Sequence, residues 1–329
     1  MSEFDWIKRA LSPLTNREPG TFALKNDGAV LHHDPGRDIV ISTDTLIENT
    51  HFLSGEDPGH IAQKALRVNL SDLAAMGAKP LCYTLNLALT KAQDKDFLEA
   101  FVSGLQKDQE EFSLYLLGGD TTTGEGRLTI TMTLFGSVPE GACWGRSNAC
   151  EGDYVYITGS IGEGVLGLYL RQQTMTCSDP ELSHRLIHRH LLPQPRADIY
   201  KLAADNLVSA AIDISDGVIA DLGHICNHSG VAIDINLSDL PIESDTLELC
   251  AQADIPIKDL AAGGDDYELV LCVNSDKNEE FLESSKTLPF SLKNIGRLRA
   301  SRGESSGAVR LFDNEGRDIT PLKTGWTHF

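Results

Sequence analysis

The chain has 329 residues, of which 41% are hydrophobic and 23% charged, and this suits one large or two medium globular domains. Its net charge of −20 argues against a nucleic-acid backbone or an anionic membrane surface as a partner. No stretch reaches the ~18–20 consecutive apolar residues that a membrane span requires.

The seven cysteines contain no CxxC pair, which argues against a zinc knuckle. Their odd number argues against a disulfide framework. The opening stretch MSEFDWIKRA is acidic and amphipathic and lacks the apolar centre of a signal peptide. A reducing cytoplasm is therefore the expected location.

The first half of the chain predicts a mixture of strands and helices. The expected elements are a short helix at 4–11, strands at 38–43, 81–89 and 127–138, and helices at 59–76 and 94–112. The helix at 59–76 carries small and apolar residues on most of its faces, which predicts burial against a sheet. Gly77 ends this helix, and Pro80 prevents it from continuing.

A segment rich in turn-forming residues at 139–152 precedes a second unit. The elements expected beyond it are strands at 154–159, 231–237 and 266–273 and helices at 162–173, 180–190, 195–209 and 217–228. The tail at 275–329 has a less regular pattern, with a loop expected at 301–307. Because strands and helices mix in both halves, the sequence predicts two α/β domains of similar size.

Short motifs that contain aspartate recur where apolar stretches end. They are Asp27 in KNDGAV, Asp44 in VISTDTL, Asp72 in VNLSDLAAMGA, Asp120 in LLGGDTTTG, Asp213 and Asp216 in AIDISDG, and Asp265 and Asp266 in GGDDYEL. Any one of them alone is typical of a turn or an N-cap. Asp72 differs because it lies in an apolar helical pattern, where a carboxylate needs hydrogen bonds or a cation. A set of oxygen ligands without histidine or cysteine favours Mg²⁺ over zinc.

Two glycine-rich stretches follow apolar runs and are candidates for phosphate-binding backbone. These are GGD at 118–120 and TGSIGEG at 158–164. The chain contains neither a GxxxxGK[ST] P-loop nor the HRD and DFG motifs of protein kinases. Any ATP site in this chain would therefore be built differently from those two.

The ordered motifs resemble those of the thiamine-monophosphate kinase family, within the superfamily of aminoimidazole-ribonucleotide synthetase. The motifs that carry the resemblance are ISTDTLIENTHF, NLSDLAAMGAKP, LLGGDTT, GRSNACEGDYVYITG, AIDISDGVIADLGHI, GGDDYELV and the terminal GWTHF. The resemblance implies phosphorylation of thiamine monophosphate by ATP to give thiamine diphosphate, by direct in-line transfer with several Mg²⁺ ions. A phosphate oxygen of the substrate would be the nucleophile, so no residue is expected to act as a general base.

The resemblance also implies the fold and the roles of residues. The fold would be the two-domain α/β (α+β) arrangement of the superfamily. The N-terminal domain, 1–140, would contain a mixed sheet with helices on one face, bind ATP and Mg²⁺ and form a homodimer. The C-terminal α+β domain, 150–329, would complete the active site. Metal ligands would be Asp27, Ser42, Thr43, Asp44, Asp72, Asp120, Asp213 and Asp216; ATP contacts Gly119, Asp120, Arg146 and Ser215; and thiamine-phosphate contacts His51, Asp265 and Trp326.

This chain departs from the family pattern in two motifs. Where the family has Gly-(Ile/Pro)-Gly-Asp-Asp, the sequence is altered so that only the second acid remains, as Asp27, after Lys25 and Asn26. In the late motif, Asp265 stands where glutamate is usual. The loop around Asp27 is therefore expected to be the most altered part of the site.

Alternatives stay open for three residues and for the function. His51 could be a packing or capping residue, Arg146 a solvated loop residue, and Trp326 an anchor for the end of the chain. The chain could also be a sibling ATP-dependent enzyme, or a weakened homologue that binds nucleotide or thiamine phosphate. Two siblings are disfavoured because the first cysteine is Cys82 and the chain ends in Phe329, not in a cysteine.

Overall fold

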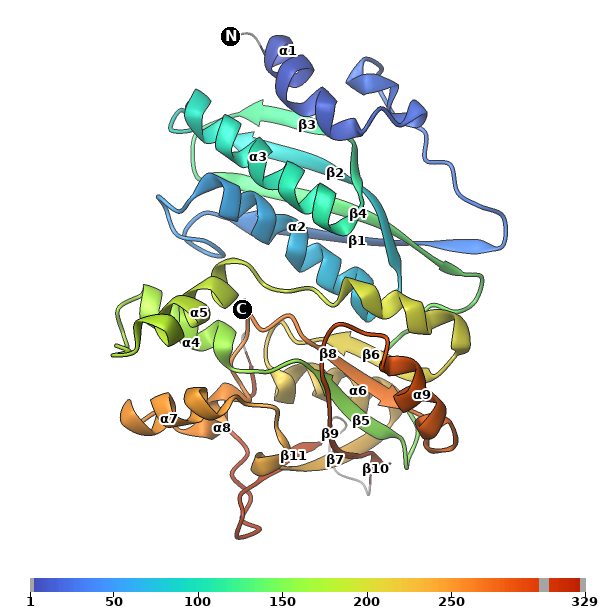
Figure 1. Ribbon diagram of the computed structural model, residues 1–329, viewed down its shortest axis with the longest axis vertical. Helices are drawn as coiled ribbons and strands as arrows, with labels where there is room; N and C mark the ends of the chain where they lie inside the picture. The colour runs from blue at the N-terminus through green and yellow to red at the C-terminus, as the bar shows by residue number, and fades with distance from the viewer. Residues whose placement is uncertain (1–2, 302–307, 326–329) are drawn as a thin grey trace. The chain divides into compact units, whose positions relative to one another are not determined.

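The computed structural model describes residues 3–301 and 308–325 and divides the chain into two compact units (Figure 1). Unit 1 comprises Met1–Leu73 and Ala78–Gly141, and unit 2 comprises Ala74–Gly77 and Ala142–Phe329. Trp326 and residues 302–307 of the expected loop lie outside the described residues. Within the described ranges, no helix is long and apolar enough to cross a membrane.

Unit 1 is built on a four-stranded sheet in the order β1-β4-β2-β3. Its strands are β1 (Arg37–Ile47), β2 (Lys79–Leu89), β3 (Tyr115–Thr123) and β4 (Thr129–Pro139). Strand β4 pairs antiparallel with both β1 and β2, whereas β2 and β3 are parallel and are connected through α3 (Lys95–Phe112). Helices α2 (Pro58–Ala75) and α3 lie on one face of the sheet (Figure 1). The expected mixed sheet with helices on one face is confirmed.

The N-terminal segment of unit 1 consists of short helical turns. The expected helix at 4–11 is present as α1 (Glu3–Trp6) followed by a π-helical turn, η1 (Ile7–Leu11). Two 3₁₀ turns follow, η2 (Ser12–Thr15) and η3 (Pro19–Leu24). Both contact β3, so this segment lies along the edge of the sheet.

Two strands of unit 1 are longer than their apolar patterns indicate. Strand β1 continues to Ile47, and the GGD stretch lies inside β3, which reaches Thr123. Strand β3 pairs only with β2, so its polar end can face solvent. Asp44 and Asp120 therefore lie within strands, and their expected place in turns at strand ends is wrong.

Unit 2 contains a four-stranded antiparallel sheet in the order β6-β8-β5-β9 and a small sheet in the order β10-β7-β11. The strands are β5 (Tyr154–Thr158), β6 (Val208–Asp213), β7 (Val231–Asn236), β8 (Leu269–Val273), β9 (Leu292–Arg297), β10 (Arg299–Ala300) and β11 (Val309–Phe312). The helices are α4 (Glu163–Arg171), α5 (Pro180–Leu191), α6 (Val218–Ser229), α7 (Ser244–Gln252), α8 (Ile257–Leu260) and α9 (Asn278–Ser285), with 3₁₀ turns η4 (Ala197–Asp205), η5 (Leu237–Asp239) and η6 (Ser275–Lys277).

Two expectations for unit 2 need correction. The helix expected at 195–209 is a 3₁₀ segment that ends at Asp205, because the chain enters β6 at Val208. The tail from 275 is more regular than expected, since it contains α9, β9, β10 and β11. Polar residues such as those of LKNIGR in β9 conceal the strand, because only Ile295 of that strand is buried.

Strand β8 shows why the larger sheet of unit 2 is stable. Val270 and Cys272 pack with α6 in one apolar cluster, while Leu271 and Val273 pack with Phe281 of α9 in another. Successive side chains of a strand point to opposite faces, so both faces of β8 are covered. The continuous apolar run LVLCV follows from this double burial. The packing of both faces of β8 also fixes the ends of β6 and β8, where two of the acidic motifs lie.

Candidate functional site

Three of the expected metal ligands meet in unit 1. Ser42 and Asp44 lie on β1 in alternation with the buried Val40 and Leu46, so all four share one face of the strand. Ser42 Oγ donates a hydrogen bond of 2.5 Å to Asp72 Oδ2 on α2, and a side-chain hydrogen bond also joins Asp44 to Asp72. The β1 strand and the α2 helix thus bring two carboxylates and a hydroxyl together.

This Ser42–Asp44–Asp72 group lies in a partly desolvated place. Burial raises the pKa of Asp44, against the opposite effects of its hydrogen bond with Asp72 and of the charge on His51. Two carboxylates at hydrogen-bonding distance need a shared proton or a cation between them, since two bare negative charges repel each other. The group therefore suits a small cation with oxygen ligands.

Thr43 and His51 are placed differently from these three. The Thr43 side chain is exposed on the opposite face of β1, where its Oγ1 lies 3.0 Å from Thr133 Oγ1 and donates to Met132 O. His51 closes the turn after β1, because its Nδ1 accepts a hydrogen bond of 2.9 Å from the Ile47 N–H. This is the capping role that the sequence leaves open for His51.

The altered motif around Asp27 forms an exposed bend after η3. Phe22, Ala23 and Leu24 precede it with φ angles of 50°, 53° and 58°, a region that favours glycine. Because glycine is absent from these positions, the left-handed backbone costs roughly 1 kcal/mol or more for each residue. Asp27 is therefore presented on a strained and solvated segment.

Gly119 and Asp120 lie in the exposed end of β3, with Gly119 opposite Leu85 of β2. A Cβ atom on Gly119, whose φ is 155°, would lie 1.9 Å from the Leu85 carbonyl oxygen. A Cβ atom on the neighbouring Gly118 would have nothing within 4 Å. The close approach of two strands thus accounts for glycine at 119, independently of any ligand.

Replacement of Gly119 by alanine should lower the free energy of unfolding by about 2 to 3 kcal/mol, because the new Cβ atom forces β3 away from β2. Gly118→Ala is the matched control and should change the free energy by less than about 0.5 kcal/mol. Urea unfolding followed by circular dichroism measures both variants. Equal stabilities of the two variants would contradict this account of Gly119.

In unit 2, two acidic loops lie side by side at the ends of β6 and β8. Asp213 ends β6 and is buried, and the loop that follows it carries Ser215 and Asp216. Backbone hydrogen bonds connect this loop to the 263–268 segment: the Asp265 N–H donates to Ser215 O at 2.9 Å, and the Tyr267 N–H donates to Ile214 O at 2.8 Å. Four of the expected site residues, Asp213, Ser215, Asp216 and Asp265, are brought together in this way.

A buried carboxylate that sequence reasoning missed holds the first of these loops. Asp221 of α6 accepts hydrogen bonds of 3.0 Å from the N–H groups of Asp216 and Gly217. Burial raises its pKa to about 7. The sequence feature that could have identified Asp221 is a carboxylate inside the apolar helical pattern VIADLGHI. The same feature distinguishes Asp72.

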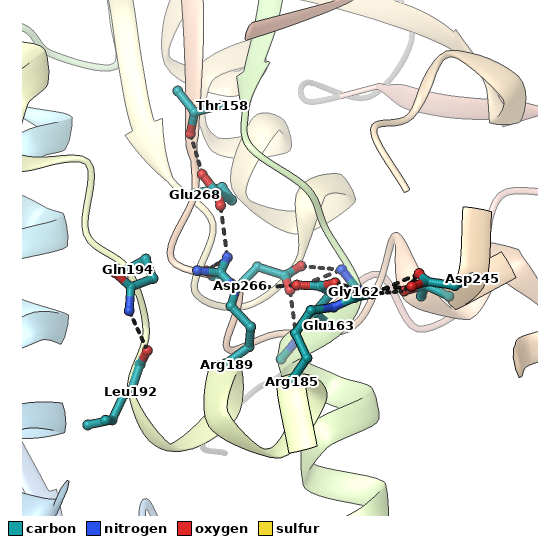
Figure 2. A network of polar contacts seen from close by, with 12 residues as sticks. Thr158, Gly162, Glu163, Arg185, Arg189, Leu192, Gln194, Asp245, Asp266 and Glu268 are labelled. Carbon is teal, nitrogen blue, oxygen red and sulfur yellow. Dashed lines mark hydrogen bonds and ion pairs between the residues drawn. The ribbon is translucent and has the colours of Figure 1, made fainter. Parts of the chain in front are cut away.

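Four backbone N–H groups of the glycine-rich turn at 158–164 donate within the protein: those of Gly159, Ile161, Gly162 and Gly164. The buried carboxyl group of Asp266 accepts hydrogen bonds from the Gly162 N–H, at 2.8 and 3.0 Å to its two oxygens (Figure 2). It also accepts one from the Gly164 N–H at 3.1 Å. The carboxyl group at the N-terminus of α4 thus belongs to a side chain of the protein itself.

The stability contributed by Asp266 should fall as the pH rises from about 4 to about 7. Burial raises the pKa of Asp266 to about 7, although the Gly162 and Gly164 N–H groups favour the ionised form. The folded chain thus keeps a proton that the unfolded chain loses near its ordinary pKa. The wild-type protein should therefore lose stability relative to Asp266→Asn by up to about 1.4 kcal/mol per pH unit.

Urea unfolding of the wild type and Asp266→Asn at several pH values between 4 and 7.5 measures this difference. Asp221, whose raised pKa acts in the same direction, is present in both proteins and cancels in the comparison. A constant difference across this range would mean that Asp266 is already ionised in the folded protein at pH 4.

A buried network of charges supports the second acidic loop. Glu268 is fully buried and accepts hydrogen bonds from Thr158 Oγ1 at 2.6 Å and from Arg189 at 2.8 Å (Figure 2). It also pairs with Arg196. Arg189 also approaches Glu163 at 3.5 Å. The sequence carried no signal for these pairings, because the residues are far apart along the chain.

The remaining expected contact in the described residues is Arg146. Its side chain is exposed, and its backbone carbonyl accepts a hydrogen bond of 2.8 Å from Ser229 Oγ at the end of α6. The neighbouring Gly145 carbonyl accepts from the Ala211 N–H of β6. The backbone is thus fixed while the guanidinium remains accessible. Across residues 3–301 and 308–325, no three His, Cys, Asp or Glu side chains form a group that could hold a metal ion.

Comparisons with known proteins cover nearly the whole chain. Residues 25–138 match the family model "AIR synthase related protein, N-terminal domain", and residues 151–308 match the corresponding C-terminal domain. The thiamine-monophosphate kinase of Caulobacter vibrioides is 35% identical over 99% of this chain and 91% of that protein. That of Salmonella typhimurium is 41% identical over 92% of this chain and 90% of that protein.

Solved structures agree with this result. A crystal structure of thiamine-monophosphate kinase from Stenotrophomonas maltophilia superposes with a TM-score of 0.82 at 33% identity, covering 94% of this chain and 96% of that one. The structure of AaThiL complexed with AMPPCP and TMP superposes with a TM-score of 0.77 at 29% identity, covering 95% of this chain and 98% of that one.

Proposed function

Since the chain belongs to the thiamine-monophosphate kinase family, we propose that Mg²⁺ held by its acidic motifs assists its reaction. That reaction is the ATP-dependent phosphorylation of thiamine monophosphate to thiamine diphosphate. The finer part of the proposal is that the phosphoryl group passes directly, in line, from ATP to a phosphate oxygen of the substrate.

The observation that carries the metal proposal is the Ser42–Asp44–Asp72 group. Its donors are all oxygen atoms, Asp44 and Asp72 are joined by a hydrogen bond, and burial raises the pKa of Asp44. A divalent cation can replace the shared proton and satisfy both carboxylates, so these residues fit Mg²⁺. When bound, Mg²⁺ would neutralise phosphate charge and orient the phosphates.

Five further residues complete the proposed set of metal ligands. They are Asp27, Thr43 and Asp120 in unit 1 and Asp213 and Asp216 in unit 2. Asp27 and Asp120 are exposed and accessible to a cation, whereas the Thr43 side chain is on the other face of β1. Any ligand from Thr43 would therefore be its backbone carbonyl oxygen.

The proposed nucleotide contacts are Gly119, Asp120, Arg146 and Ser215, and the proposed substrate contacts are His51, Asp265 and Trp326. The accessible guanidinium of Arg146 suits a phosphate group, which it can bind through two N–H donors. His51 would contact a substrate through Nε2, because its Nδ1 accepts from Ile47. No residue is assigned as a general base, because the phosphate nucleophile is already ionised near neutral pH.

We also propose that unit 1 is the ATP-binding and Mg²⁺-binding part and forms a homodimer. The face of β1 turned away from α2 and α3 carries Thr43, Thr45 and the apolar Ile41, a residue that is 61% exposed. β1 is also an edge strand of its sheet, which leaves backbone groups available for pairing. Sedimentation equilibrium tests the dimer, and a monomer at all concentrations would contradict it.

Isothermal titration of Mg²⁺ in the presence of a non-hydrolysable ATP analogue tests the metal proposal without turnover. The wild type should bind Mg²⁺, and Asp44→Asn should bind it at least about tenfold more weakly because a ligand charge is lost. Asp96→Asn, an exposed change in the first turn of α3, is the matched control and should bind as the wild type does. Equal binding by Asp44→Asn would remove the metal assignment from this residue.

A further inference from the structure

The GGDDYEL segment alternates between inward and outward side chains. Asp266 and Glu268 are buried, whereas Asp265 and Tyr267 are only partly buried and have φ angles of 67° and 51°. Left-handed backbone at a residue other than glycine costs roughly 1 kcal/mol or more and persists only where the surroundings enforce it. The segment is therefore held in this shape by specific contacts.

Those contacts come from both buried acids of the segment. Asp266 is fixed by the Gly162 and Gly164 N–H groups, and Glu268 is fixed by Arg189, Arg196 and Thr158. The backbone of Asp265 rests directly on the α4 turn, because a Cβ atom on Gly164 would lie 2.3 Å from the Asp265 carbonyl oxygen. Position 265 thus has little freedom to move its backbone.

The side chain of Asp265 then meets a histidine. His190 Nδ1, in the last turn of α5, lies 3.2 Å from Asp265 Oδ2, which is within the range of an ion pair. The His190 side chain is 5% exposed, and that of Asp265 is 28% exposed. One carboxylate oxygen of Asp265 therefore faces a buried ring, while part of the side chain is accessible from solvent.

We propose that His190 is a positioning residue that holds the Asp265 carboxylate in the orientation needed to bind thiamine monophosphate. The inference rests on the proposed substrate contact of Asp265. A carboxylate there suits the cationic thiazolium of thiamine. Aspartate has a single methylene between its backbone and its carboxylate, so its reach depends on how the side chain is oriented. His190 supplies that orientation and makes no contact with the substrate itself.

The test is a double-mutant cycle read from the KM for thiamine monophosphate. His190→Leu and Asp265→Asn should each raise that KM roughly tenfold, because the first removes the ring nitrogen that faces the carboxylate and the second removes the charge of the carboxylate. The KM for ATP should stay within about twofold of the wild-type value. The double variant should resemble Asp265→Asn alone, because His190 has no carboxylate to orient in that background.

Three further variants complete the experiment. His190→Asn keeps an N–H donor near the Nδ1 position and should restore a KM within about threefold of the wild type. His184→Leu, an exposed change on the same helix, is the matched control and should leave both KM values unchanged. If His190→Leu does not fold by circular dichroism, His190→Ala takes its place in the cycle, since a smaller side chain cannot clash.

The outcomes separate this inference from the proposed substrate contact. If Asp265→Asn leaves the KM for thiamine monophosphate unchanged, the substrate contact fails, and the inference fails with it. If Asp265→Asn raises that KM and His190→Leu does not, only the positioning role is overturned. A double variant whose effect is the product of the two single effects, about a hundredfold, would also overturn it, because the residues would then act independently.

Discussion

Asp72→Asn should lower kcat by about a hundredfold to a thousandfold while the protein stays folded. The asparagine carbonyl can still accept the hydrogen bond from Ser42 Oγ, so the junction of α2 and β1 keeps its contact. The negative charge is lost, however, and with it the affinity of the Ser42–Asp44–Asp72 group for a divalent cation. Steady-state kinetics at saturating substrates and circular dichroism of the same sample measure the two effects.

Asp44 should behave as Asp72 does, and an exposed aspartate of the same unit is the control. Asp44→Asn should produce a loss of similar size, and the double variant should be little worse than either single one because residues that act as a unit are not additive. Asp96→Asn, an exposed aspartate of the same unit, should keep its kcat within about twofold. Near-normal turnover by Asp72→Asn would show that this residue does not hold the metal.

Glu268→Gln should lower the free energy of unfolding by about 3 to 5 kcal/mol. Glutamine has nearly the same shape but no charge, so Arg189 and Arg196 would face a buried neutral amide in place of a carboxylate. Removal of one partner from a buried ion pair is costly because the other partner remains charged and poorly solvated. Urea unfolding monitored by circular dichroism provides the measurement.

Glu283→Gln is the matched control for this substitution. Glu283 of α9 pairs with Lys286, the residue that follows the helix, but the two side chains are 74% and 69% exposed. Solvent screening makes such a pair worth about 0 to 1 kcal/mol, so the control should change stability by no more than that. If the two variants proved equally stable, the Glu268 network would not be the anchor of the GGDDYEL segment.

Much of the fold follows from apolar periodicity. The helices expected at 59–76 and 94–112 coincide with α2 and α3 to within one residue at each end, because each has a long amphipathic or apolar pattern. The end of β3 could not be anticipated in the same way. Its residues Gly118–Thr123 are polar or lack a side chain, and they are a strand only because β2 pairs with them.

The site was predictable in its residue types but not in its internal contacts. The motifs correctly indicated that acids gather near one another, as Asp44 and Asp72 do beside Ser42. Acids that are neighbours in the sequence can nevertheless differ in their burial and in their contacts. Asp266 points inward to cap α4, while Asp265 lies beside His190, and the difference depends on left-handed backbone that the sequence pattern does not encode.

The partner of the glycine-rich turn at 158–164 also depends on the tertiary fold. The pattern of the turn predicts backbone N–H groups that bind a phosphate. In the structure two of those groups bind the carboxyl group of Asp266, which is about a hundred residues later in the chain. A local motif cannot report a partner that the tertiary fold supplies.

The central claim is that this chain phosphorylates thiamine monophosphate with ATP in a reaction that needs Mg²⁺. The most direct measurement incubates the purified, folded protein with ATP and thiamine monophosphate across a series of Mg²⁺ concentrations and detects thiamine diphosphate by chromatography. Thiamine diphosphate should form in proportion to enzyme, rise with Mg²⁺ and disappear when EDTA removes the metal. Absence of thiamine diphosphate at every Mg²⁺ concentration, from protein shown to be folded, would contradict the account.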